Sequence, residues 1–434
     1  MNISIVQSMI NSIDKPAIFI NTQYVILAVN DAYRDTYENE VRVGNSRCYE
    51  ISHGHSKPCD QHGEQCPIQA CQSTQRASSV MHVHNTDFGK TYCDILMKPV
   101  KDENGITTGF LEILDKINFA SVESEKNKML GTSVPFKNML TKINRAAKAE
   151  ISVLLHGETG TGKELVAKAL HDASRRSKKP FVVIECTGLN ENLFESELFG
   201  HEKGSFTGAV QNKKGLIEEA QGGTVFFDEI ADVTLSMQVK LLRLIETQCY
   251  RTVGGTKLKK ADFRLICASH KNLLNLVEQG LFRKDLYYRI AGFPISLPSL
   301  SERQDDIPAL ANHFLQGSEM KYKKFSKAAM KHLCEYSFPG NIRELKSIVE
   351  QSVLLADEDI IELNDLPEQT KVKGAVNNVS NLPETLVSLD ELEKRYLTNL
   401  CIDPKHTIDE LAEKLDVSTR TLYRKLQKYG LKYE

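Results

Sequence analysis

A glycine-rich run after a short apolar stretch is the segment whose residue types most directly suggest chemistry. Residues 151–156 (ISVLLH) lead into GETGTGKE at 157–164. In such a loop, glycines let backbone N–H groups close around phosphates, the next helix presents its positive end, and a lysine reaches the β- and γ-phosphates. The pattern predicts a nucleotide-binding loop between a strand and a helix. Its expected contact residues are Gly157, Glu158, Thr159, Gly160, Thr161, Gly162, Lys163 and Glu164.

Two acids after another apolar stretch supply the partner motif. In GGTVFFDE, residues 222–229, Asp228 could bind Mg²⁺ and Glu229 could polarise an attacking water. The position after Lys163 holds Glu164 instead of the Ser or Thr that usually adds a magnesium ligand. Either motif alone could be structural. Both together, in this order and in an α/β segment, predict an enzyme that hydrolyses ATP with Mg²⁺.

Four cysteines and three histidines lie within 24 residues of the N-terminal part. Thiolate and imidazole groups suit zinc, iron or an iron–sulfur cluster. The spacings match no short CxxC finger, so three interpretations stay open: a metal or cluster site, a metal-free thiol redox sensor, and a structural or small-ligand role. The cysteines are Cys48, Cys59, Cys66 and Cys71, with His53, His55 and His62 as replacement ligands.

The C-terminal end concentrates positive charge in a chain whose net charge is only -2. Residues 418–430 (STRTLYRKLQKYG) contain basic residues and no acid, which suits contacts to nucleic-acid phosphates. Thr407, with Glu410 at the capping-box position, and Ser418 are expected to begin two helices. A generic helical hairpin is the plainer alternative to a helix-turn-helix. The expected apolar stripe consists of Leu411, Ala412, Leu415, Leu422 and Leu426.

Composition limits the class of protein that could position these groups. A chain of 434 residues exceeds one hydrophobic core, so two to four domains are expected. With 41% hydrophobic and 26% charged residues, it reads as an ordinary water-soluble protein. No stretch approaches the roughly 20 apolar residues that span a bilayer, and the N-terminus lacks a secretory pattern. We therefore expect a cytoplasmic protein without a membrane partner.

Shifts in residue pattern divide the chain. Short apolar runs (AIFI from Ala17, YVILAV from Tyr24) and a turn at Asn104–Gly105 predict strands in the first part. A polar, helix-permissive connector follows, then alternating strands and amphipathic helices with a parallel sheet, a polar linker, and three short helices. The expected boundaries are 1–117, 118–129, 130–367, 368–385 and 386–434.

Five segments together resemble the AAA+ domain of NtrC-type enhancer-binding proteins, the activators of sigma-54 RNA polymerase. They are GETGTGKE, ESELFGHEKGSFTGA (195–209), GGTVFFDEI, GLFRKDLYYRI (280–290) and FPGNIRELK (338–346). Glu164 is the usual residue of that family. The N-terminal strand pattern resembles a PAS domain, and TLYRKLQKYGL resembles the Fis-type DNA-binding module. The implied fold is multidomain: an α+β PAS-like sensor, an α/β AAA+ P-loop ATPase with a helical lid, and an all-α helix-turn-helix.

The resemblance implies a function and a set of roles. The chain would be a signal-responsive activator that binds upstream double-stranded DNA and hydrolyses ATP to remodel sigma-54 polymerase. A homo-oligomer, from dimer to hexameric ring, would carry Arg283 and Arg289 to the neighbouring subunit's ATP, while Arg343 would sense nucleotide from the lid. Residues 388–400 would form the dimer element. The sigma-54 loop would use Gly204, Phe206, Thr207 and Gly208. The expected DNA contacts are Ser418, Arg420, Thr421, Arg424, Lys425 and Lys428.

Three features depart from the family pattern. Ser205 replaces an alanine in GSFTGA, a small-for-small change that should be tolerated. Ser269 and His270 match the polar first sensor only loosely. Glu185 stands where an asparagine usually holds the catalytic glutamate, so a repulsion between Glu185 and Glu229 is expected, and Glu185→Asn should change the basal ATPase rate.

Overall fold

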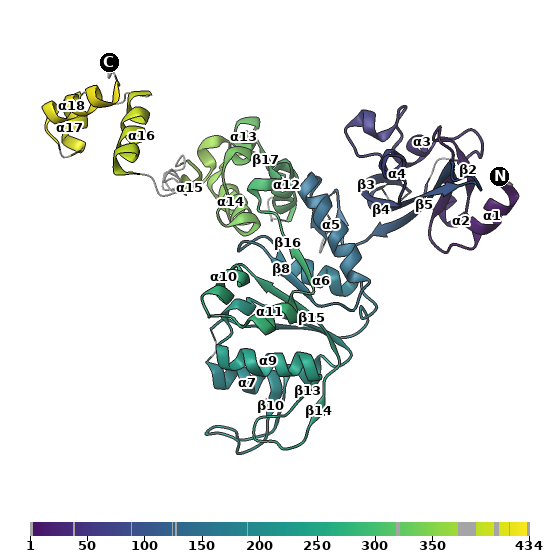
Figure 1. Ribbon diagram of the computed structural model, residues 1–434, viewed down its shortest axis with the longest axis horizontal. Coiled ribbons are helices and arrows are strands. Elements are labelled where there is room, and N and C mark those ends of the chain that lie inside the picture. Colours follow the sequence, from purple (N-terminus) through teal and green to yellow (C-terminus); the bar gives the residue numbers. More distant parts are fainter. Residues whose placement is uncertain are drawn as a thin grey trace. The chain divides into compact units, whose positions relative to one another are not determined.

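The computed structural model (Figure 1) describes residues 3–37, 40–87, 89–123, 125, 128–188, 190–317, 322–371, 388–402, 408–415 and 417–431. It contains two compact units, residues 1–370 and 371–434. No helix in this described part of the chain is long and apolar enough to cross a membrane. Most of the expected linker at 368–385 lies outside the described residues, as does the expected cap at Thr407.

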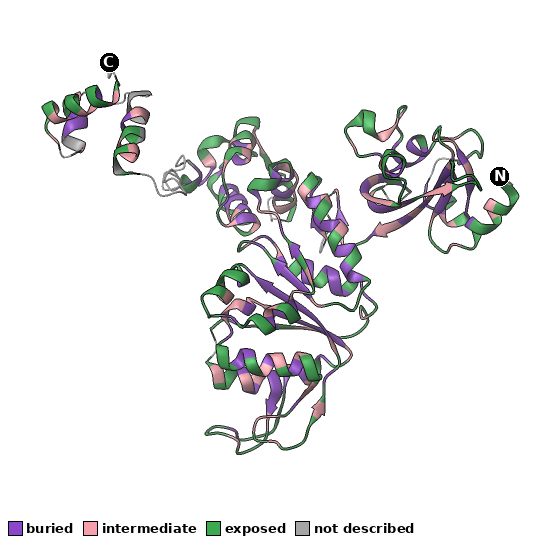
Figure 2. Cartoon of the chain, viewed as in Figure 1, coloured by how far each residue is buried: buried purple, intermediate pink, exposed green. Residues whose placement is uncertain are grey.

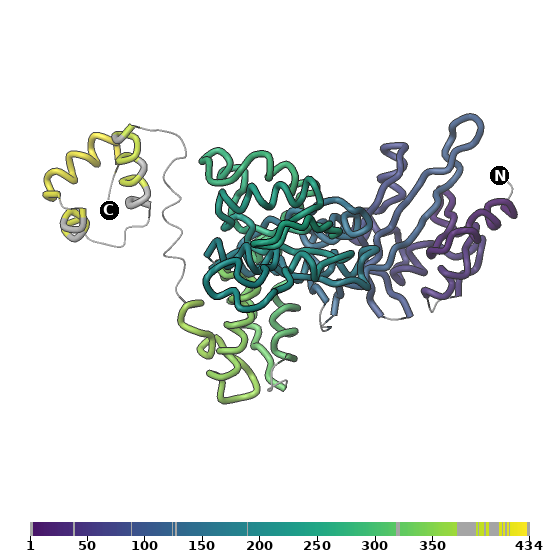
Figure 3. The backbone as a smooth tube through the Cα atoms, turned by 90° about the horizontal axis from the view of Figure 1, so that it is seen from below, coloured from purple at the N-terminus to yellow at the C-terminus, as the bar shows by residue number. Residues whose placement is uncertain are grey.

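An antiparallel sheet forms the N-terminal domain. Its strands are β1 Ala17–Ile20, β2 Ile26–Val29, β3 Ser78–Thr86, β4 Gly89–Lys101 and β5 Thr107–Ile117. The strand order is β2-β1-β5-β4-β3, with every pair antiparallel. The expected strand at residues 17–20 and the expected hairpin are confirmed, and the apolar run at 24–29 is a strand from Ile26 to Val29. Gly105 has φ 79°, the left-handed conformation that suits its turn, and the hairpin is the long slate-blue loop at the N-terminal end of Figure 3.

Helices cover the two faces of this sheet unequally. The helix α1 Ile3–Asn11 packs on one face through Ile10. The opposite face carries a larger apolar core built by the short helices between β2 and β3. These helices are α2 Asp31–Arg34, α3 Cys48–His53, the 3-10 turn η1 Cys59–His62 and α4 Pro67–Thr74.

One carboxyl group lies inside that larger core. Glu112 is only 4% exposed and follows the alternation of β5, so it lies on the same face as the buried Phe110 and Leu114. Its partners across the strands, Ile18 and Met97, belong to the same core. Burial raises the pKa of Glu112 to about 8, because the apolar surroundings disfavour the charged carboxylate.

The Glu112 carboxyl should make the stability of this domain depend on pH. The folded state binds the proton more tightly than the unfolded chain, so the stabilisation is complete below the unfolded pKa and is lost as pH rises toward 8. Glu112→Gln should raise the unfolding free energy by about 1–3 kcal/mol at about pH 8 and leave it nearly unchanged at about pH 4. Hydrogen exchange of the β1, β4 and β5 amides in the full chain measures this. The exposed Glu103→Gln is the control, and equal pH dependence in parent and Glu112→Gln would contradict the prediction.

The connector at 118–129 differs from its prediction. Where it is described it is extended, and β6 Ala120–Ser121 pairs in parallel with β7 Met129–Leu130. Ala120 and Met129 are buried in the core of the central domain. Burial of the apolar side chains at the two ends of the polar run therefore outweighs its helix propensity.

A parallel five-stranded sheet forms the central domain. Its strands are β8 Val153–His156, β9 Phe181–Glu185, β12 Gly223–Asp228, β15 Phe263–Ser269 and β16 Phe293–Ser296. The order is β16-β8-β15-β12-β9, which confirms the expected parallel α/β sheet. In Figure 2 these strands form the buried, purple centre of the domain.

Helices sandwich the parallel sheet. One face is covered by α5 Val134–Ala147 and α6 Lys163–Asp172. The other face packs against helices that include α7 Glu191–Phe199, α9 Leu235–Thr247 and α11 Lys284–Ile290. The remaining short elements are β10 Gly200–His201, β11 Lys213–Lys214, α8 Leu216–Glu219, η2 Ile230–Asp232, β13 Cys249–Tyr250, β14 Lys259–Lys260 and α10 Leu273–Glu278.

A helical subdomain with its own core follows the sheet, as the expected lid. Its main helices are α12 Ile307–Gly317, α13 Lys327–Glu335 and α14 Asn341–Leu355. The minor elements are η3 Ser301–Asp306, β17 Lys324–Phe325, β18 Ile360–Ile361, η4 Leu363–Asp365 and α15 Glu368–Lys371.

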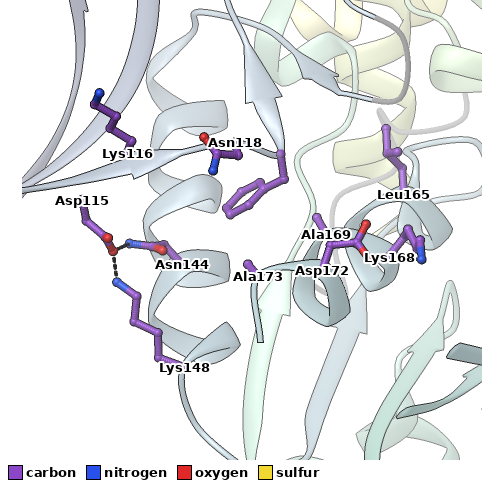
Figure 4. Close-up of a pocket in the computed structure, with 11 residues that line it drawn as sticks. Asp115, Lys116, Asn118, Asn144, Lys148, Leu165, Lys168, Ala169, Asp172 and Ala173 are labelled. Atoms are coloured by element: carbon purple, nitrogen blue, oxygen red, sulfur yellow. Dashed lines mark hydrogen bonds and ion pairs between the residues drawn. The ribbon is translucent and has the colours of Figure 1, made fainter. Parts of the chain in front are cut away.

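Polar contacts join the N-terminal sheet to α5. Asn144 donates from Nδ2 to Asp94 Oδ2 at 2.8 Å and to Asp115 Oδ2 at 3.1 Å. Figure 4 shows that the Asp115 carboxylate accepts a hydrogen bond from Asn144 and forms an ion pair with Lys148, in a pocket where β5 meets α5 and α6. Because α5 also packs on the parallel sheet, a change in the N-terminal domain has a direct contact route to the central domain.

The second unit contains three helices among its described residues: α16 Leu389–Ile402, α17 Ile408–Lys414 and α18 Thr419–Tyr429. The expected apolar stripe is confirmed, since Leu411, Ala412, Leu422 and Leu426 form one buried cluster with Leu397. Ser418 caps α18 by accepting from the Thr421 amide, as the sequence predicts.

Candidate functional site

The glycine-rich loop connects β8 to α6 at the carboxyl end of the parallel sheet. Gly162 caps α6 with φ 97°, and Lys163 is the first residue of the helix. The Lys163 ammonium is only 7% exposed and donates to Gly157 O at 3.1 Å. It also lies 3.1 Å from Glu229 Oε1. The loop therefore holds a buried cation at the start of a helix, an arrangement suited to phosphates.

The pKa values of the two acids at the end of β12 are shifted in opposite directions. Burial, followed by the charge of Glu229, raises the pKa of Asp228. Burial alone would also raise the pKa of Glu229, but hydrogen bonds from His270 and Lys163 outweigh it and lower that pKa. Glu229 thus remains a carboxylate, held in a left-handed conformation with φ 52°.

His270 is the main partner of Glu229 besides the lysine. Glu229 Oε2 accepts from the His270 backbone N–H at 3.0 Å and interacts with His270 Nδ1 at 2.7 Å. His270 directly follows β15, whose neighbour in the sheet is β12. The carboxyl ends of parallel strands meet at one edge, which explains how residues 41 positions apart come together.

The expected repulsion between Glu185 and Glu229 has no counterpart in the site. Glu185 ends β9 as an exposed side chain and lines a separate hollow with Val183 and Leu193. Its strand pairs in register with β12, so Glu185 lies opposite Asp228 rather than Glu229. The carboxylate of Glu229 is instead engaged by two positive or donating groups, Lys163 and His270.

The lid meets the glycine-rich loop through the start of α14. Asn341 Nδ2 donates to Glu158 Oε2 at 2.8 Å and to Thr159 O at 3.2 Å. The backbone N–H of Ile342 donates to Gly160 O at 3.0 Å, and a Cβ on Gly160 would lie 2.2 Å from Gly340 O. Only glycine fits at position 160.

A single pocket brings together the loop, the acids and the lid. Lys163, Asp228, Glu229, His270 and Arg343 all line it. Sequence reasoning assigned no role to five further lid residues of this pocket, four of which lie outside the quoted motifs, while Lys346 ends FPGNIRELK. They are Arg303, Leu310, His313, Phe314 and Lys346.

We expect His270→Ala to lower kcat for ATP hydrolysis about tenfold with little change in KM, because a hydrogen bond to a charged group contributes about 1.5–3 kcal/mol. Steady-state ATPase assays measure this. Glu185→Asn is the matched control and should leave the basal rate unchanged, since Glu185 lies in a separate hollow. A large effect of Glu185→Asn with none of His270→Ala would restore the sequence-based expectation.

The GSFTGA segment forms an exposed loop beyond the short strand β10. Gly204 and Gly208 have φ 84° and 108°, so both use the left-handed region. Phe206 is 44% exposed and its ring meets the His201 ring edge-on at 5.0 Å. Ser205 packs against Gly254 of the neighbouring β13–β14 loop, where a Cβ would lie 2.6 Å from Ser205 Cβ. Both loops extend from the bottom of the domain in Figure 1.

Comparison with known proteins identifies this architecture. Three family models match in succession: "PAS fold" over residues 10–118, "Sigma-54 interaction domain" over 129–296 and "AAA+ ATPase lid domain" over 301–382. The transcriptional regulatory protein ZraR of Escherichia coli (strain K12) is 42% identical over 312 residues, 71% of this chain and 70% of ZraR. The chain belongs to the family of sigma-54-dependent transcriptional activators. The activator is an AAA+ ATPase, and ATP is its nucleotide.

A second relative and two solved structures are similar to a part of the chain of the same extent. The nitrogen fixation protein AnfA of Azotobacter vinelandii is 39% identical over 314 residues, 71% of this chain but only 58% of AnfA. Crystal structures of NtrX from Brucella abortus in complex with ADP and with ATP are each 31% identical, with TM-scores of 0.53 and 0.52. They cover 71% of this chain, and the chain covers 70% and 71% of theirs.

The two expected arginine fingers of the activator do not line its own nucleotide pocket. Arg283 is exposed and forms two hydrogen bonds with Asp285, at 3.1 and 2.7 Å. Arg289, at the end of α11, is also exposed.

The four cysteines of the PAS domain do not converge on one point. Cys48, Cys66 and Cys71 are buried in the core of the domain. Cys71 donates to Met97 O at 3.3 Å. Among the described residues, the one group whose ligand atoms lie close enough to hold a metal is His53, Cys59 and His82. Sequence reasoning missed His82, because it follows 11 residues after the cysteine-rich segment.

Burial lowers the pKa of three histidines at or beside that group. Burial, together with the charge of His82, lowers the pKa of His53 to about 4. Burial likewise lowers the pKa of His82 and, further, that of His84. His84 Nδ1 lies 2.6 Å from the Tyr37 hydroxyl.

The basic residues of α18 divide into two sets. Lys425 pairs with Glu393 and Lys428 with Asp390, both acids of α16. Arg420 and Arg424 are exposed. Two of the positive charges of α18 are therefore paired with acids of the same unit, and the two arginines are exposed to solvent.

Proposed function

We propose that this activator hydrolyses ATP in a ring of identical subunits to remodel closed promoter complexes of sigma-54 RNA polymerase, while its C-terminal helices hold it at upstream double-stranded DNA. The single observation that carries the proposal is Phe206, an exposed aromatic on a loop with two left-handed glycines in an AAA+ domain. An apolar side chain held in solvent on such a loop is suited to contact a partner protein. Its partner would be sigma-54, through Gly204, Phe206, Thr207 and Gly208.

The residues of the pocket would divide the chemistry. Lys163 would bind the β- and γ-phosphates, Asp228 would hold Mg²⁺, and Glu229 would polarise the attacking water. Arg343, which lines the same pocket from the lid, would respond to the nucleotide. The raised pKa of Asp228 beside ionised Glu229 would fall when Mg²⁺ binds, because the cation favours the carboxylate.

The ring would complete the active site. Arg283 and Arg289 are exposed and absent from the pocket of their own subunit, which supports a role at a neighbouring subunit's ATP. An arginine supplied in this way is worth roughly 10³–10⁵ in rate in other phosphoryl-transfer enzymes.

The DNA contacts would come from the exposed side of α18. Ser418, Arg420, Thr421 and Arg424 remain the leading candidates, while Lys425 and Lys428 would contact phosphates only after leaving their acidic partners on α16. A Fis-type helix-turn-helix is the arrangement that the three packed helices support.

The domain order would transmit a signal from residues 1–117 through the connector to the ATPase at 130–367. The PAS domain would sense redox state, a metal or a small ligand. Its contacts with α5 support such transmission, since α5 packs on the catalytic sheet.

Reconstituted transcription tests the proposal. A supercoiled template with an upstream binding site, sigma-54 polymerase, the full chain and ATP should give transcripts. Omitting sigma-54 or replacing ATP with a non-hydrolysable analogue should abolish them, and deleting the upstream DNA should weaken them. Activation that persists with the analogue, or with polymerase carrying another sigma factor, would overturn the proposed function.

A further inference from the structure

Three ligand-type side chains from three different elements meet inside the PAS domain. They are His53 at the end of α3, Cys59 at the start of η1 and His82 in β3. One ligand atom from each lies within 4.8 Å of the others. Both histidines are buried, whereas Cys59 is half-buried.

Backbone hydrogen bonds fix the tautomers of the two histidines. His53 Nδ1 lies 3.1 Å from Val83 O, and His82 Nε2 lies 2.8 Å from Gln65 O. A carbonyl oxygen can only accept, so each of these ring nitrogens carries the hydrogen of its neutral imidazole. The other nitrogens, His53 Nε2 and His82 Nδ1, are therefore lone-pair donors, as in metal-ligating histidines whose second nitrogen donates to a carbonyl.

Those two lone pairs face each other at 3.3 Å. They cannot form a hydrogen bond with each other, because neither nitrogen carries a hydrogen. Two nitrogens bound about 2.05 Å from a tetrahedral zinc ion would themselves lie about 3.3 Å apart. The histidine pair is thus already spaced for one cation, and the Cys59 sulfur needs only a short approach to join it.

A carboxylate is available for the fourth position. Glu64 Oε2 lies 3.8 Å from His82 Nδ1, which faces the site, and 4.0 Å from His53 Nδ1, which donates to Val83 O, so Glu64 would have to move to reach the ion. Its other oxygen, Oε1, lies 3.3 Å from the ammonium of Lys137. Lys137 belongs to α5, so the Glu64 carboxylate lies between the histidines of the PAS domain and a helix of the ATPase domain.

We propose that His53, Cys59 and His82 bind one divalent ion of the zinc type, and that Glu64 completes the ligand set at the expense of its ion pair with Lys137. Two imidazoles, one thiolate and one carboxylate form a set that suits a tetrahedral borderline-soft cation. On binding, the Cys59 thiol releases its proton to solvent and a sulfur–metal bond forms. The buried Cys48, Cys66 and Cys71 take no part.

The site would also regulate. Metal binding draws Glu64 away from Lys137 and so removes one contact between the PAS domain and α5. The contacts of Asn144 with Asp94 and Asp115 would remain. This regulatory sense rests on the proposed function of the PAS domain, whereas the binding itself does not.

The first experiment titrates the metal-free full chain, prepared with a chelator under reducing conditions, with Co²⁺ and then Zn²⁺. One equivalent of Co²⁺ should give the visible bands of a tetrahedral site and a thiolate-to-cobalt charge-transfer band, and Zn²⁺ should bleach both. No saturable binding, or a stoichiometric iron–sulfur cluster in protein purified without oxygen, would overturn the proposal.

Matched variants locate the ligands. Cys59→Ser should remove the charge-transfer band and weaken Zn²⁺ binding about a hundredfold, measured by competition with a chromophoric chelator. His82→Asn should weaken binding to a similar degree. Cys66→Ala and the exposed His62→Asn should bind normally. Equal loss in Cys66→Ala, with the fold intact by circular dichroism, would instead favour a site made from the cysteines.

The regulatory part has its own test. Lys137→Met frees Glu64 and should tighten Zn²⁺ binding about two- to fivefold, as expected for a partly exposed ion pair. Lys142→Met changes an exposed lysine of the same helix and should have no effect. Unchanged affinity in Lys137→Met would overturn the coupling. These titrations need neither DNA nor polymerase, so their failure would leave the proposed activator function standing.

Discussion

Lys163→Ala should abolish ATP binding, whereas Glu229→Ala should bind ATP and fail to hydrolyse it. The Lys163 ammonium is buried beside the loop carbonyl of Gly157, and its removal leaves no buried cation in the loop to face the phosphates. We expect the Kd for ATP to rise at least about a hundredfold, since the charge-assisted contacts that Lys163 would make to phosphate oxygens would be lost.

For Glu229→Ala the loss should appear in kcat. A positioned general base contributes about 10²–10⁴ in rate, so kcat should fall by that factor. ATP affinity should hold or increase, because Lys163 no longer exchanges an ion pair with Glu229 when phosphate arrives. Fluorescent-nucleotide titration and a phosphate-release assay separate binding from turnover.

The control for both variants is Lys168→Ala. Lys168 lies on α6, more than one turn beyond Lys163. Its side chain is half-exposed and forms an ion pair with Asp172 of the same helix at 3.1 Å. It should bind and hydrolyse ATP normally. Hydrolysis at the parent rate by Glu229→Ala would show that another group polarises the water.

Phe206→Ala should eliminate sigma-54-dependent transcription while ATPase activity and DNA binding stay near the parent values. The side chain is 44% exposed and belongs to no core cluster, and its ring meets the His201 ring, so its loss should remove little from the core. A large aromatic at the centre of an interface commonly contributes 2 kcal/mol or more, roughly a thirtyfold loss of partner binding. Transcription from a sigma-54 promoter and pull-down of sigma-54 in the presence of a transition-state analogue measure the effect.

Two loop variants complete this test. Phe206→Tyr keeps the aromatic face and should retain most activity. Val210→Ala alters a side chain that is 71% exposed just past the same loop, and should be neutral. Full activation by Phe206→Ala would remove the observation on which the proposed function stands.

The strands and the nucleotide motifs could be predicted because their causes are local. The short apolar runs at residues 17–20 and 24–29 and the turn at Asn104–Gly105 each depend on a few neighbouring residues. The loop at 157–164 and the acids at 228–229 are short motifs placed after strands, and parallel pairing brings strand ends to one edge. Local patterns therefore sufficed to place Lys163, Asp228 and Glu229 in one pocket.

The failures involve contacts between distant segments. The resemblance marked His270 only as a loose match to a sensor residue, and nothing near Glu229 in the sequence indicates its contact with His270, 41 residues later. The cysteine-rich segment suggested four cysteine ligands, yet Cys48, Cys66 and Cys71 enter a core whose other walls include β1, β4 and β5. The charges of Lys425 and Lys428 looked available for DNA, but acids from α16 meet them. Residue type gave the chemistry in each case, and tertiary contact decided its use.

The hydrogen bonds between the glycine-rich loop and the start of α14 would turn a small rotation of the loop into a larger movement of the lid. The helix α14 begins at its hydrogen bonds to Gly160 O and Thr159 O, and its 15 residues extend about 22 Å from there. A tilt of α14 by about 5° about its first residues displaces its far end by about 2 Å. A shift of the loop too small to disturb the phosphates would thus become a displacement comparable to a side-chain contact distance. Hydrolysis of the nucleotide would in this way change the position of the far end of α14, which does not contact the nucleotide.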